Sequence, residues 1–486
     1  MRWPPATARL ARRGCPPRCG PAPASGRRRR RCPGRIPRGE SPVGGPQHRP
    51  AGLGCALVEK LGWTHVRPGV DRATVTLSNV LLRAPTAEEF PAMWRSLIDA
   101  FGEPLHESDQ DLEQRAFEPD RSLIAVDGED VVATAGILSR ELTVPGAIMA
   151  MAGVTLVSVA PTHRRRGLLT TMMTRQLTEL HEQGGESVAT LWASEAPIYQ
   201  RFGYGNAAPR AVLTGATRET AFRPEVDLGT GRVRRLSEDT VRPHARAVYE
   251  ELRPSAVGWL DRSDIWWTRR HYDPDHQREG HTELRFAVHE ERDGQVTGWA
   301  SYRIKGDFGP TGPNGLMAIL DVSATTPPAY AALWRFLLDH DLVRRFRRRM
   351  CSTDEALQHL VQNPRAVQTE LSDALWVRLV DVDRALAARR YSTELDVVLD
   401  VEDDRCPWNA GRWRLSAGPD GAECVSTTAP ADLRLTSTEL GAGYLGGASL
   451  TALARAGRVS ELTTGSLQRT ATAFGWHTAP WCPEVF

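Results

Sequence analysis

The chain has 486 residues, 41% of them hydrophobic, which is enough for a buried core and suggests about three domains. No apolar run reaches the roughly 18 residues of a membrane span, and the eight cysteines are scattered without a C-x-x-C pair. A membrane protein, a zinc site and a disulfide framework are therefore not indicated, and a reducing cytoplasm is the expected compartment.

The net charge of +2 hides two segments of opposite sign. Residues 1–73 hold 16 Lys and Arg against 3 Asp and Glu and include the run Arg27–Arg31, whereas the remainder holds 45 basic and 56 acidic residues. A nucleic-acid-binding arm and a disordered tail both fit the first segment. We favour a third interpretation, a spurious extension translated from GC-rich coding sequence, with Val75 as a candidate start. The segment lacks the clean apolar region of a signal peptide.

The chain beyond residue 73 mixes helices with strands. Thr86–Phe101 carries apolar residues at helical spacing. Two apolar runs, Leu123–Val126 and Val131–Leu138, flank the dipeptide Asp127-Gly128 and predict a hairpin. The apolar run Ala147–Ala160 then predicts a buried strand that stops at Pro161.

A basic turn follows that strand. It contains His163, Arg164, Arg165 and Arg166, and a helix is expected from just after Gly167 to Gly184-Gly185, before a strand at Val188–Trp192. Cations at a helix start oppose the helix dipole unless an anion lies there. Free backbone N–H groups beside a glycine and several arginines therefore indicate a phosphate site. The alternative is a solvated basic turn.

A weaker copy of this order comes next: a hairpin from Leu284–His289 and Gln295–Tyr302, a strand at Leu316–Val322 and a helix at Pro328–Leu338. Its turn, residues 324–328, has neither Arg nor Gly, and its two prolines remove N–H donors. We expect this unit to be structural. The basic run Arg344–Arg349 is interpreted as a solvated helix face.

From about residue 379 the pattern predicts an α+β module without a catalytic cluster. Its expected elements are a helix at Asp381–Arg389, strands at Leu395–Val401, Arg412–Leu415 and Asp432–Leu435, and a helix that includes Leu450–Ala454.

Two motifs carry a resemblance to a known family. The turn Arg164-Arg165-Arg166-Gly167-Leu168-Leu169 fits the Q/R-x-x-G-x-G/A coenzyme A cradle of GNAT acetyltransferases, except that Leu169 stands where a small residue is usual. The second motif, Ala193-Ser194-Glu195-Ala196-Pro197-Ile198-Tyr199-Gln200-Arg201-Phe202-Gly203-Tyr204-Gly205, follows the next strand. Together they closely resemble the enhanced intracellular survival (Eis) acetyltransferases of actinobacteria, from residue 74 to the end.

The resemblance implies an α/β and α+β architecture of two tandem GNAT-like domains followed by a domain similar to sterol carrier proteins. The domains implied are 74–222, which is catalytic, 223–378, which lacks a coenzyme A site, and 379–486. Residues 1–73 belong to none of these three domains.

The resemblance also implies site residues. Tyr199 matches the general acid, with Tyr204 as a nearby rival, and the terminal carboxylate of Phe486 matches the general base. The implied coenzyme A contacts are the backbone of Val157, Ser158 and Val159, the pyrophosphate-lining residues Arg165, Arg166, Gly167, Leu168, Leu169 and Thr170, and the residues Ser194 and Glu195. An α-carboxyl has a pKa of about 3.3–3.7 in water, so it needs partial burial to act as a base. Without the resemblance, a frayed end is the ordinary expectation for Phe486.

The implied reaction is direct acetyl transfer from acetyl-CoA to an amine, without a covalent enzyme intermediate or a metal. The implied acceptors are polyamines such as aminoglycosides, or a lysine side chain, and the implied assembly is a homohexamer. Two positions depart from the family: Val485 stands where an acidic residue is common, and Trp192 stands where the family has a histidine. Both border the expected acceptor pocket.

Two other functions remain open at this stage. One is a carrier of an apolar ligand with a vestigial GNAT unit, against which the intact Arg165–Gly167 cradle and Tyr199 argue. The other is a nucleic-acid-binding regulator that uses Arg27–Arg31. Deleting residues 1–73 separates the second of these from an acetyltransferase.

Overall fold

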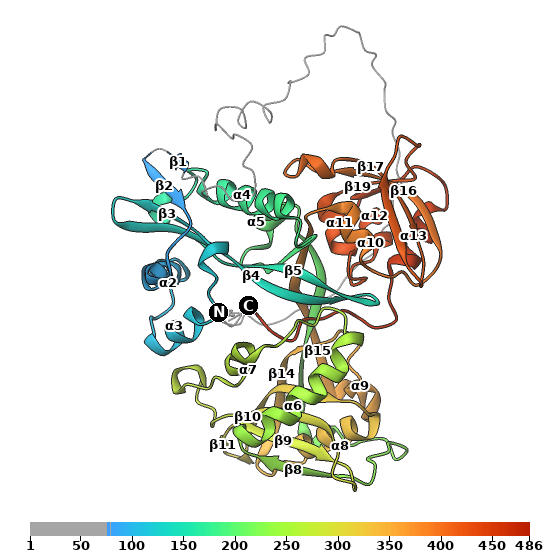
Figure 1. The fold of residues 1–486 in the computed structure, drawn as a ribbon. Coiled ribbons are helices and arrows are strands. Elements are labelled where there is room, and N and C mark those ends of the chain that lie inside the picture. The colour runs from blue at the N-terminus through green and yellow to red at the C-terminus, as the bar shows by residue number, and fades with distance from the viewer. Residues whose placement is uncertain (1–74, 78) are drawn as a thin grey trace, which may run out of the picture. The chain divides into compact units, whose positions relative to one another are not determined.

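The computed structural model describes residues 75–77 and 79–486 (Figure 1). The predictions for residues 1–73, including the basic arm, lie outside the described residues. Within the described part, no helix is both long and apolar enough to cross a bilayer.

The first unit follows the predicted order. Its strands are β1 (Val75–Leu77), β2 (Val80–Arg83), β3 (Leu123–Asp127), β4 (Asp130–Val144), β5 (Ala147–Val159), β6 (Val188–Trp192) and β7 (Gly205–Ala216). Its helices are α2 (Phe90–Phe101), α3 (Glu107–Gln114), α4 (Leu168–Gln183) and α5 (Ala196–Gln200). The helix predicted from Thr86 begins as a 3-10 turn at Ala87–Glu89 before α2, whose predicted apolar face is buried.

Helix α4 lies where the sequence predicts it. Leu168, Met172, Met173, Leu177 and Leu180 are buried on one face, as their spacing requires. The helix ends at Gly184, which adopts φ 67°, a left-handed conformation that glycine reaches without a Cβ penalty.

The second unit repeats the arrangement. Its strands are β8 (Arg232–Leu236), β9 (Arg285–Glu290), β10 (Val296–Lys305), β11 (Phe308–Gly309), β12 (Gly312–Pro313), β13 (Gly315–Ala324), β14 (Val343–Cys351) and β15 (Val367–Leu379). Its helices are α6 (Glu238–Leu252), α7 (Asp264–His271), α8 (Pro327–Leu338) and α9 (Leu357–Leu360). The start of α8 is capped by the Thr326 side chain, which accepts from the Ala329 N–H.

The prediction for Arg344–Arg349 is wrong: these residues lie in strand β14, not in a helix. Phe346 and Arg348 are buried on one face of the strand, and Arg345, Arg347 and Arg349 are exposed on the other. Burial of Arg348 is compensated by an ion pair of 2.5 Å with Glu355.

The two units share a single sheet of order β1-β2-β3-β4-β5-β6-β15-β7-β14-β13-β10-β9-β8. Strand β15 inserts between β6 and β7 of the first unit, and β7 pairs with β14 of the second. The two GNAT-like units are therefore joined by backbone hydrogen bonds as well as by the chain.

The last unit is the predicted α+β module. Its five-stranded sheet has the order β18-β17-β16-β19-β20, from β16 (Leu395–Glu402), β17 (Gly411–Ala417), β18 (Ala422–Ser426), β19 (Leu433–Thr436) and β20 (Val459–Glu461). Its helices are α10 (Val382–Ala387), α11 (Ser437–Gly443), α12 (Leu450–Arg455) and α13 (Ser466–Phe474). The sequence did not predict β18, β20, α11 and α13.

The long β4–β5 hairpin reaches both other units (Figure 1). The Thr143 N–H donates to the Trp259 carbonyl of the second unit, and the Arg390 N–H of the last unit donates to the Pro145 carbonyl in the hairpin turn. The hairpin thus connects the predicted site to both neighbouring units.

Candidate active site

Strands β5 and β6 separate at the centre of the first unit. They pair in parallel only through Ala152 with Ala189 and Gly153 with Thr190, while the other edge of β5 pairs with β4 as far as Val159. Beyond Gly153, one edge of β5 therefore has no strand partner among the described residues. An extended ligand that carries amides can pair with such an edge.

A β-bulge lies in β5 on the opposite edge, which pairs with β4. The register with β4 shifts between Thr134 and Gly136, and Leu156 adopts φ 54°, in the left-handed region. The Thr134 hydroxyl donates to the Leu156 carbonyl at 2.6 Å and lies 2.8 Å from the Ser158 hydroxyl. Because the Ser158 side chain is buried in this way, only its backbone is free to contact a ligand.

The basic turn connects β5 to α4 through a 3-10 turn at Pro161–His163. Arg165 and Arg166 are exposed and form no ion pair with another described residue. His163 is held instead, with Nε2 3.0 Å from an oxygen of Asp127. The predicted arginines are thus available to an anion.

The start of α4 has no side-chain cap. Its N-cap residue, Gly167, adopts φ 87°, and a Cβ there would meet nothing within 4 Å, so the conformation rather than the space favours glycine. The N–H groups of Leu168, Leu169 and Thr170 precede the first intrahelical donor, Thr171. The Leu168 side chain is buried in the core, so its predicted contact is through the backbone.

The predicted acid, Tyr199, lies on α5 and is 5% exposed. Burial raises its pKa above the usual value, a hydrogen bond with Ser194 opposes that shift, and the charge of Glu195 adds to it. The phenol is therefore protonated at neutral pH. Ser194 and Glu195 are exposed at the start of α5, beside the end of β6.

The rival Tyr204 is enclosed. Its ring centroid lies 6.3 Å from that of Tyr199, but the side chain is wholly buried and its hydroxyl has no partner among the described residues. Burial raises its pKa far above the usual value. These contacts favour Tyr199 as the phenol that faces a substrate.

The terminal residue is not frayed. Phe486 is 4% exposed, and its ring packs against Gly153, where a Cβ would lie 3.1 Å from the ring atom Cε2. The last residue of the chain therefore lies where β5 and β6 separate. The sequence did not identify Gly153, although a glycine within an apolar strand is a recognised signal of close approach by another group.

Phe486 and Tyr199 lie on opposite faces of the sheet. Phe486 packs in the cluster that contains Met151, whereas Tyr199 packs in the cluster that contains Ala152 and Val154. Because successive side chains of a strand point to opposite faces, the two residues approach the separated strands from two sides. The predicted base and the predicted acid therefore lie on opposite sides of the opening between the strands.

Trp192, at the end of β6, packs against the same cluster as Phe486. Its Nε1 is buried without a partner among the described residues, and the Arg210 guanidinium lies 5.9 Å from its ring centroid. The departure from histidine therefore places a larger ring against this cluster.

Substituting Gly153 with alanine is expected to displace the Phe486 ring by a few tenths of an ångström and to lower kcat about tenfold. The cost of overpacking is about 1–3 kcal/mol in the free energy of unfolding. Steady-state kinetics and thermal unfolding measure the two effects. The matched control is Gly298→Ala in β10, where a Cβ would lie 2.9 Å from Leu333, and this variant should lose stability but keep kcat. Equal kcat values for the two variants would contradict the placement of Phe486.

Comparison with known proteins identifies the domains of the chain. Acetyltransferase (GNAT) domain models match residues 82–207 and 258–379, and a sterol carrier protein domain model matches residues 382–483. The predicted three-part architecture is thus confirmed. An uncharacterized N-acetyltransferase of Streptomyces avermitilis is 43% identical over 409 residues, which cover 83% of this chain and 99% of that protein.

Named relatives are also similar over nearly their full length. The N-acetyltransferase Eis of Mycobacterium tuberculosis is 32% identical over 411 residues, 81% of this chain and 96% of the relative. The crystal structure of Eis1 from Mycobacterium abscessus superposes with a TM-score of 0.72 at 31% identity, covering 84% of this chain and 100% of that chain. A GCN5-related N-acetyltransferase from Anabaena variabilis shows the same fold at 20% identity, with a TM-score of 0.73. On these grounds the chain is an enzyme that belongs to the Eis family of GNAT N-acetyltransferases.

Proposed function

We propose that the protein transfers the acetyl group of acetyl-CoA to a primary amine, either of an aminoglycoside-like polyamine or of a lysine side chain. The observation that carries the proposal is the buried Phe486 ring on Gly153, because a ring held there keeps the last residue close to the point where β5 and β6 separate.

The donor would lie along the free edge of β5. The backbone of Val157, Ser158 and Val159 would pair with the pantetheine amides, and Arg165, Arg166 and the N–H groups of Gly167, Leu168, Leu169 and Thr170 would hold the pyrophosphate. Ser194 and Glu195 would border the coenzyme near the thioester. The uncapped start of α4 and its exposed arginines support this fit.

The proposed chemistry needs no covalent enzyme intermediate and no metal. The Phe486 carboxylate accepts a proton from the acceptor ammonium, and the free amine attacks the thioester carbonyl. The C–S bond then breaks, and Tyr199 gives its proton to the departing sulfur. The second proton, which the nitrogen loses as the amide forms, returns to the tyrosinate, and the Phe486 carboxyl releases the first proton to solvent. The products are an amide and the free thiol of coenzyme A. Burial of both groups favours proton exchange with the substrate rather than with water.

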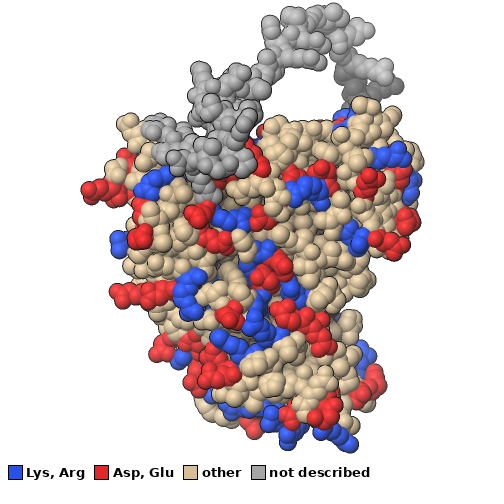
Figure 2. Space-filling view, in the orientation of Figure 1, with Lys and Arg blue, Asp and Glu red and all other residues tan. Residues whose placement is uncertain are grey.

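The net charge of the body suits a cationic acceptor. Residues 74–486 hold more acidic than basic residues, and Figure 2 shows carboxylates spread among the basic side chains of the face in view. A negative protein concentrates cations near its surface.

We also propose a homohexamer in the cytoplasm. The family resemblance supports the assembly, and the free buried thiols of Cys351, Cys406, Cys424 and Cys482 support a reducing compartment. Light scattering of the purified protein tests the assembly.

One surface hollow of the last unit does not favour the apolar-carrier alternative. This hollow, of about 610 Å³, is lined in part by four carboxylates, from Glu394, Asp396, Asp420 and Glu423. These groups are unsuited to an apolar ligand because their charge would be desolvated on binding.

A thiol-release assay tests the proposed reaction. Acetyl-CoA is offered with a panel of aminoglycosides, linear polyamines and lysine-containing peptides, and release of coenzyme A is measured with and without each amine. We expect amine-dependent release and an acetylated product by mass spectrometry. Release that no amine stimulates would contradict the proposal.

Replacement of Arg165 by alanine is expected to weaken donor binding. A charge-assisted hydrogen bond contributes about 1.5–3 kcal/mol, so the Kd for coenzyme A should rise about 10- to 100-fold. Calorimetry measures it, and Arg412→Ala, which removes an exposed arginine from β17 of the last unit, is the matched control. Unchanged affinity in the Arg165 variant would remove the phosphate site from the mechanism.

A further inference from the structure

The last eleven residues of the chain, 476–486, form a segment that we call the terminal strap. Its path is tied to the second GNAT-like unit at two places before it reaches the site. The Ala479 N–H donates to Asp354 at 2.8 Å, and the Trp481 N–H donates to the Val257 carbonyl at 3.0 Å. Trp481 also lies against the backbone of Gly258, where a Cβ would come within 2.7 Å of its carbonyl oxygen.

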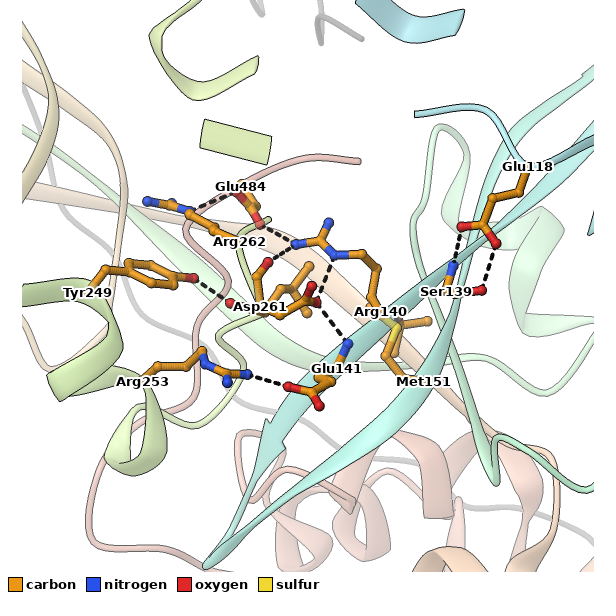
Figure 3. A network of polar contacts seen from close by, with 12 residues as sticks. Glu118, Ser139, Arg140, Glu141, Met151, Tyr249, Arg253, Asp261, Arg262 and Glu484 are labelled. Atoms are coloured by element: carbon orange, nitrogen blue, oxygen red, sulfur yellow. Dashed lines mark hydrogen bonds and ion pairs between the residues drawn. The ribbon is translucent and has the colours of Figure 1, made fainter. Parts of the chain in front are cut away.

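Glu484 ties the terminal strap to both GNAT-like units. Arg140 of β4 donates from Nη2 to Oε1 at 2.9 Å, and Arg262, which precedes α7, donates from Nε to Oε2 at 3.0 Å (Figure 3). The Glu484 side chain is 7% exposed and both arginine side chains are 1% exposed. Each carboxylate oxygen thus has its own arginine, one from each unit.

The arginines are themselves held in place. Arg140 donates to the Asp261 side chain and carbonyl, and its guanidinium lies 3.9 Å from the Trp266 ring centroid. The Arg262 guanidinium lies 4.0 Å from the ring centroid of Tyr249 and 5.0 Å from that of Trp267. These contacts hold both guanidinium groups in place, so Glu484 is bound from two sides.

The cluster keeps Glu484 ionised. Burial alone would raise its pKa, but Arg262 and Arg140, with a smaller effect of Arg270, hold the pKa below the usual range. Asp261 and Asp321 supply the remaining negative charge near these arginines. Such a buried ionic cluster is a poor source of stability compared with apolar packing, and it specifies geometry instead.

Phe486 lies two residues beyond this fixed point. Two residues span at most about 7 Å of chain, so an anchored Glu484 restricts where the terminal carboxylate can lie. Free chain ends otherwise fray. The second GNAT-like unit contributes Arg262, Val257 and Asp354 to the anchoring, although its own strand-to-helix turn has a capped helix start and two prolines in place of the cradle.

We propose that Glu484 is a positioning residue for the terminal carboxylate, and that the second GNAT-like unit serves the reaction by anchoring the terminal strap through Arg262. This inference rests on the proposed function, in which that carboxylate is the base.

The test is a double-mutant cycle between Glu484→Gln and a variant with one glycine added after Phe486, which converts the terminal carboxylate to an amide. For Glu484→Gln alone we expect kcat to fall about 10- to 100-fold, with the Kd for coenzyme A unchanged. The acidic limb of the kcat/KM profile should move to lower pH, since the arginines that Glu484 no longer neutralises favour an ionised terminal carboxylate. Glu484→Asp, which keeps the charge, should restore that limb.

A second variant guards against loss of folding. Arg262→Met with Glu484→Gln removes one positive and one negative charge together, and it leaves the Arg140–Asp261 pair intact. Its melting temperature should be close to that of the wild type, and its kcat should still fall. Circular dichroism and coenzyme A binding identify the folded variants.

The cycle distinguishes the two ways of failing. If glycine extension leaves turnover unchanged, the proposed base is wrong. Suppose that extension removes turnover. The positioning role is then wrong if folded Glu484→Gln, or the folded variant with Arg262→Met and Glu484→Gln, keeps the wild-type kcat. It is also wrong if Glu484→Gln lowers the residual rate of the extended protein by the same factor as it lowers the rate of the wild type. Non-additive losses, with no further loss in the extended protein, support it.

Discussion

A protein extended by one lysine after Phe486 is expected to lose about 100-fold or more of kcat while it binds coenzyme A with unchanged affinity. The extension turns the α-carboxylate into an amide, which cannot accept a proton at neutral pH, and places the new carboxylate one residue further along. Phe486 is 4% exposed and lies against Gly153. The packed ring therefore leaves little room for the carboxylate of the added lysine to reach the position of the original carboxylate.

The control uses the same protein molecules. Carboxypeptidase B removes a terminal lysine, so treatment of the extended protein regenerates the Phe486 carboxylate, and activity should recover in step with the mass loss. Phe486→Leu, which keeps the carboxylate on a smaller apolar residue, should retain more activity than the extended protein. Full turnover by the extended protein before trimming would show that another group is the base.

The backbone of the proposed donor site could be predicted because its signals are local in sequence. Strand β5, the basic turn and α4 follow one another, and an apolar run, a proline, a glycine and a helical repeat each specify the backbone near themselves. The structure places Arg165, Arg166 and Gly167 at the start of α4 as expected. For the same reason the hairpins and strand–helix pairs of both GNAT-like units were predicted.

The acceptor side could not be derived from local signals. Glu484 and Arg140 are 344 residues apart, and Phe486 meets Gly153 across a similar separation. No periodicity connects such positions, and only the family resemblance pointed to the terminal carboxylate. The insertion of β15 between β6 and β7 is equally non-local, since its pairing partners come from another unit.

The misassigned basic run shows a different limit. Buried and exposed residues alternate along β14, but arginine stands at both kinds of position. The hydropathy of the sequence therefore shows no two-residue period there. Arg348 is buried because Glu355 and the rings of Trp334 and Trp481 lie near it, and these partners come from other elements. Tertiary contacts thus decided the conformation of a segment that composition alone assigns to a solvated surface.

Replacement of Tyr199 by phenylalanine is expected to lower kcat about 100-fold or more, as for loss of a general acid, with little change in donor affinity. The hydroxyl lost is the one that the structure places near Ser194 at the start of α5. Because burial raises the pKa of Tyr199, the phenol stays protonated through neutral pH. Any loss of activity from its ionisation should therefore appear only above pH 10, the ordinary value, as the pH rises.

Tyr204→Phe is the matched control, since it removes the same atom from a neighbouring ring. The Tyr204 hydroxyl is buried without a partner among the described residues, so its removal costs no hydrogen bond and should leave the melting temperature equal or higher. Steady-state kinetics on both variants, with coenzyme A binding as the measure of an intact site, decide between the two tyrosines. If Tyr204→Phe loses turnover and Tyr199→Phe keeps it, the proton comes from the enclosed ring, and the substrate must then reach further into the sheet than the present geometry allows.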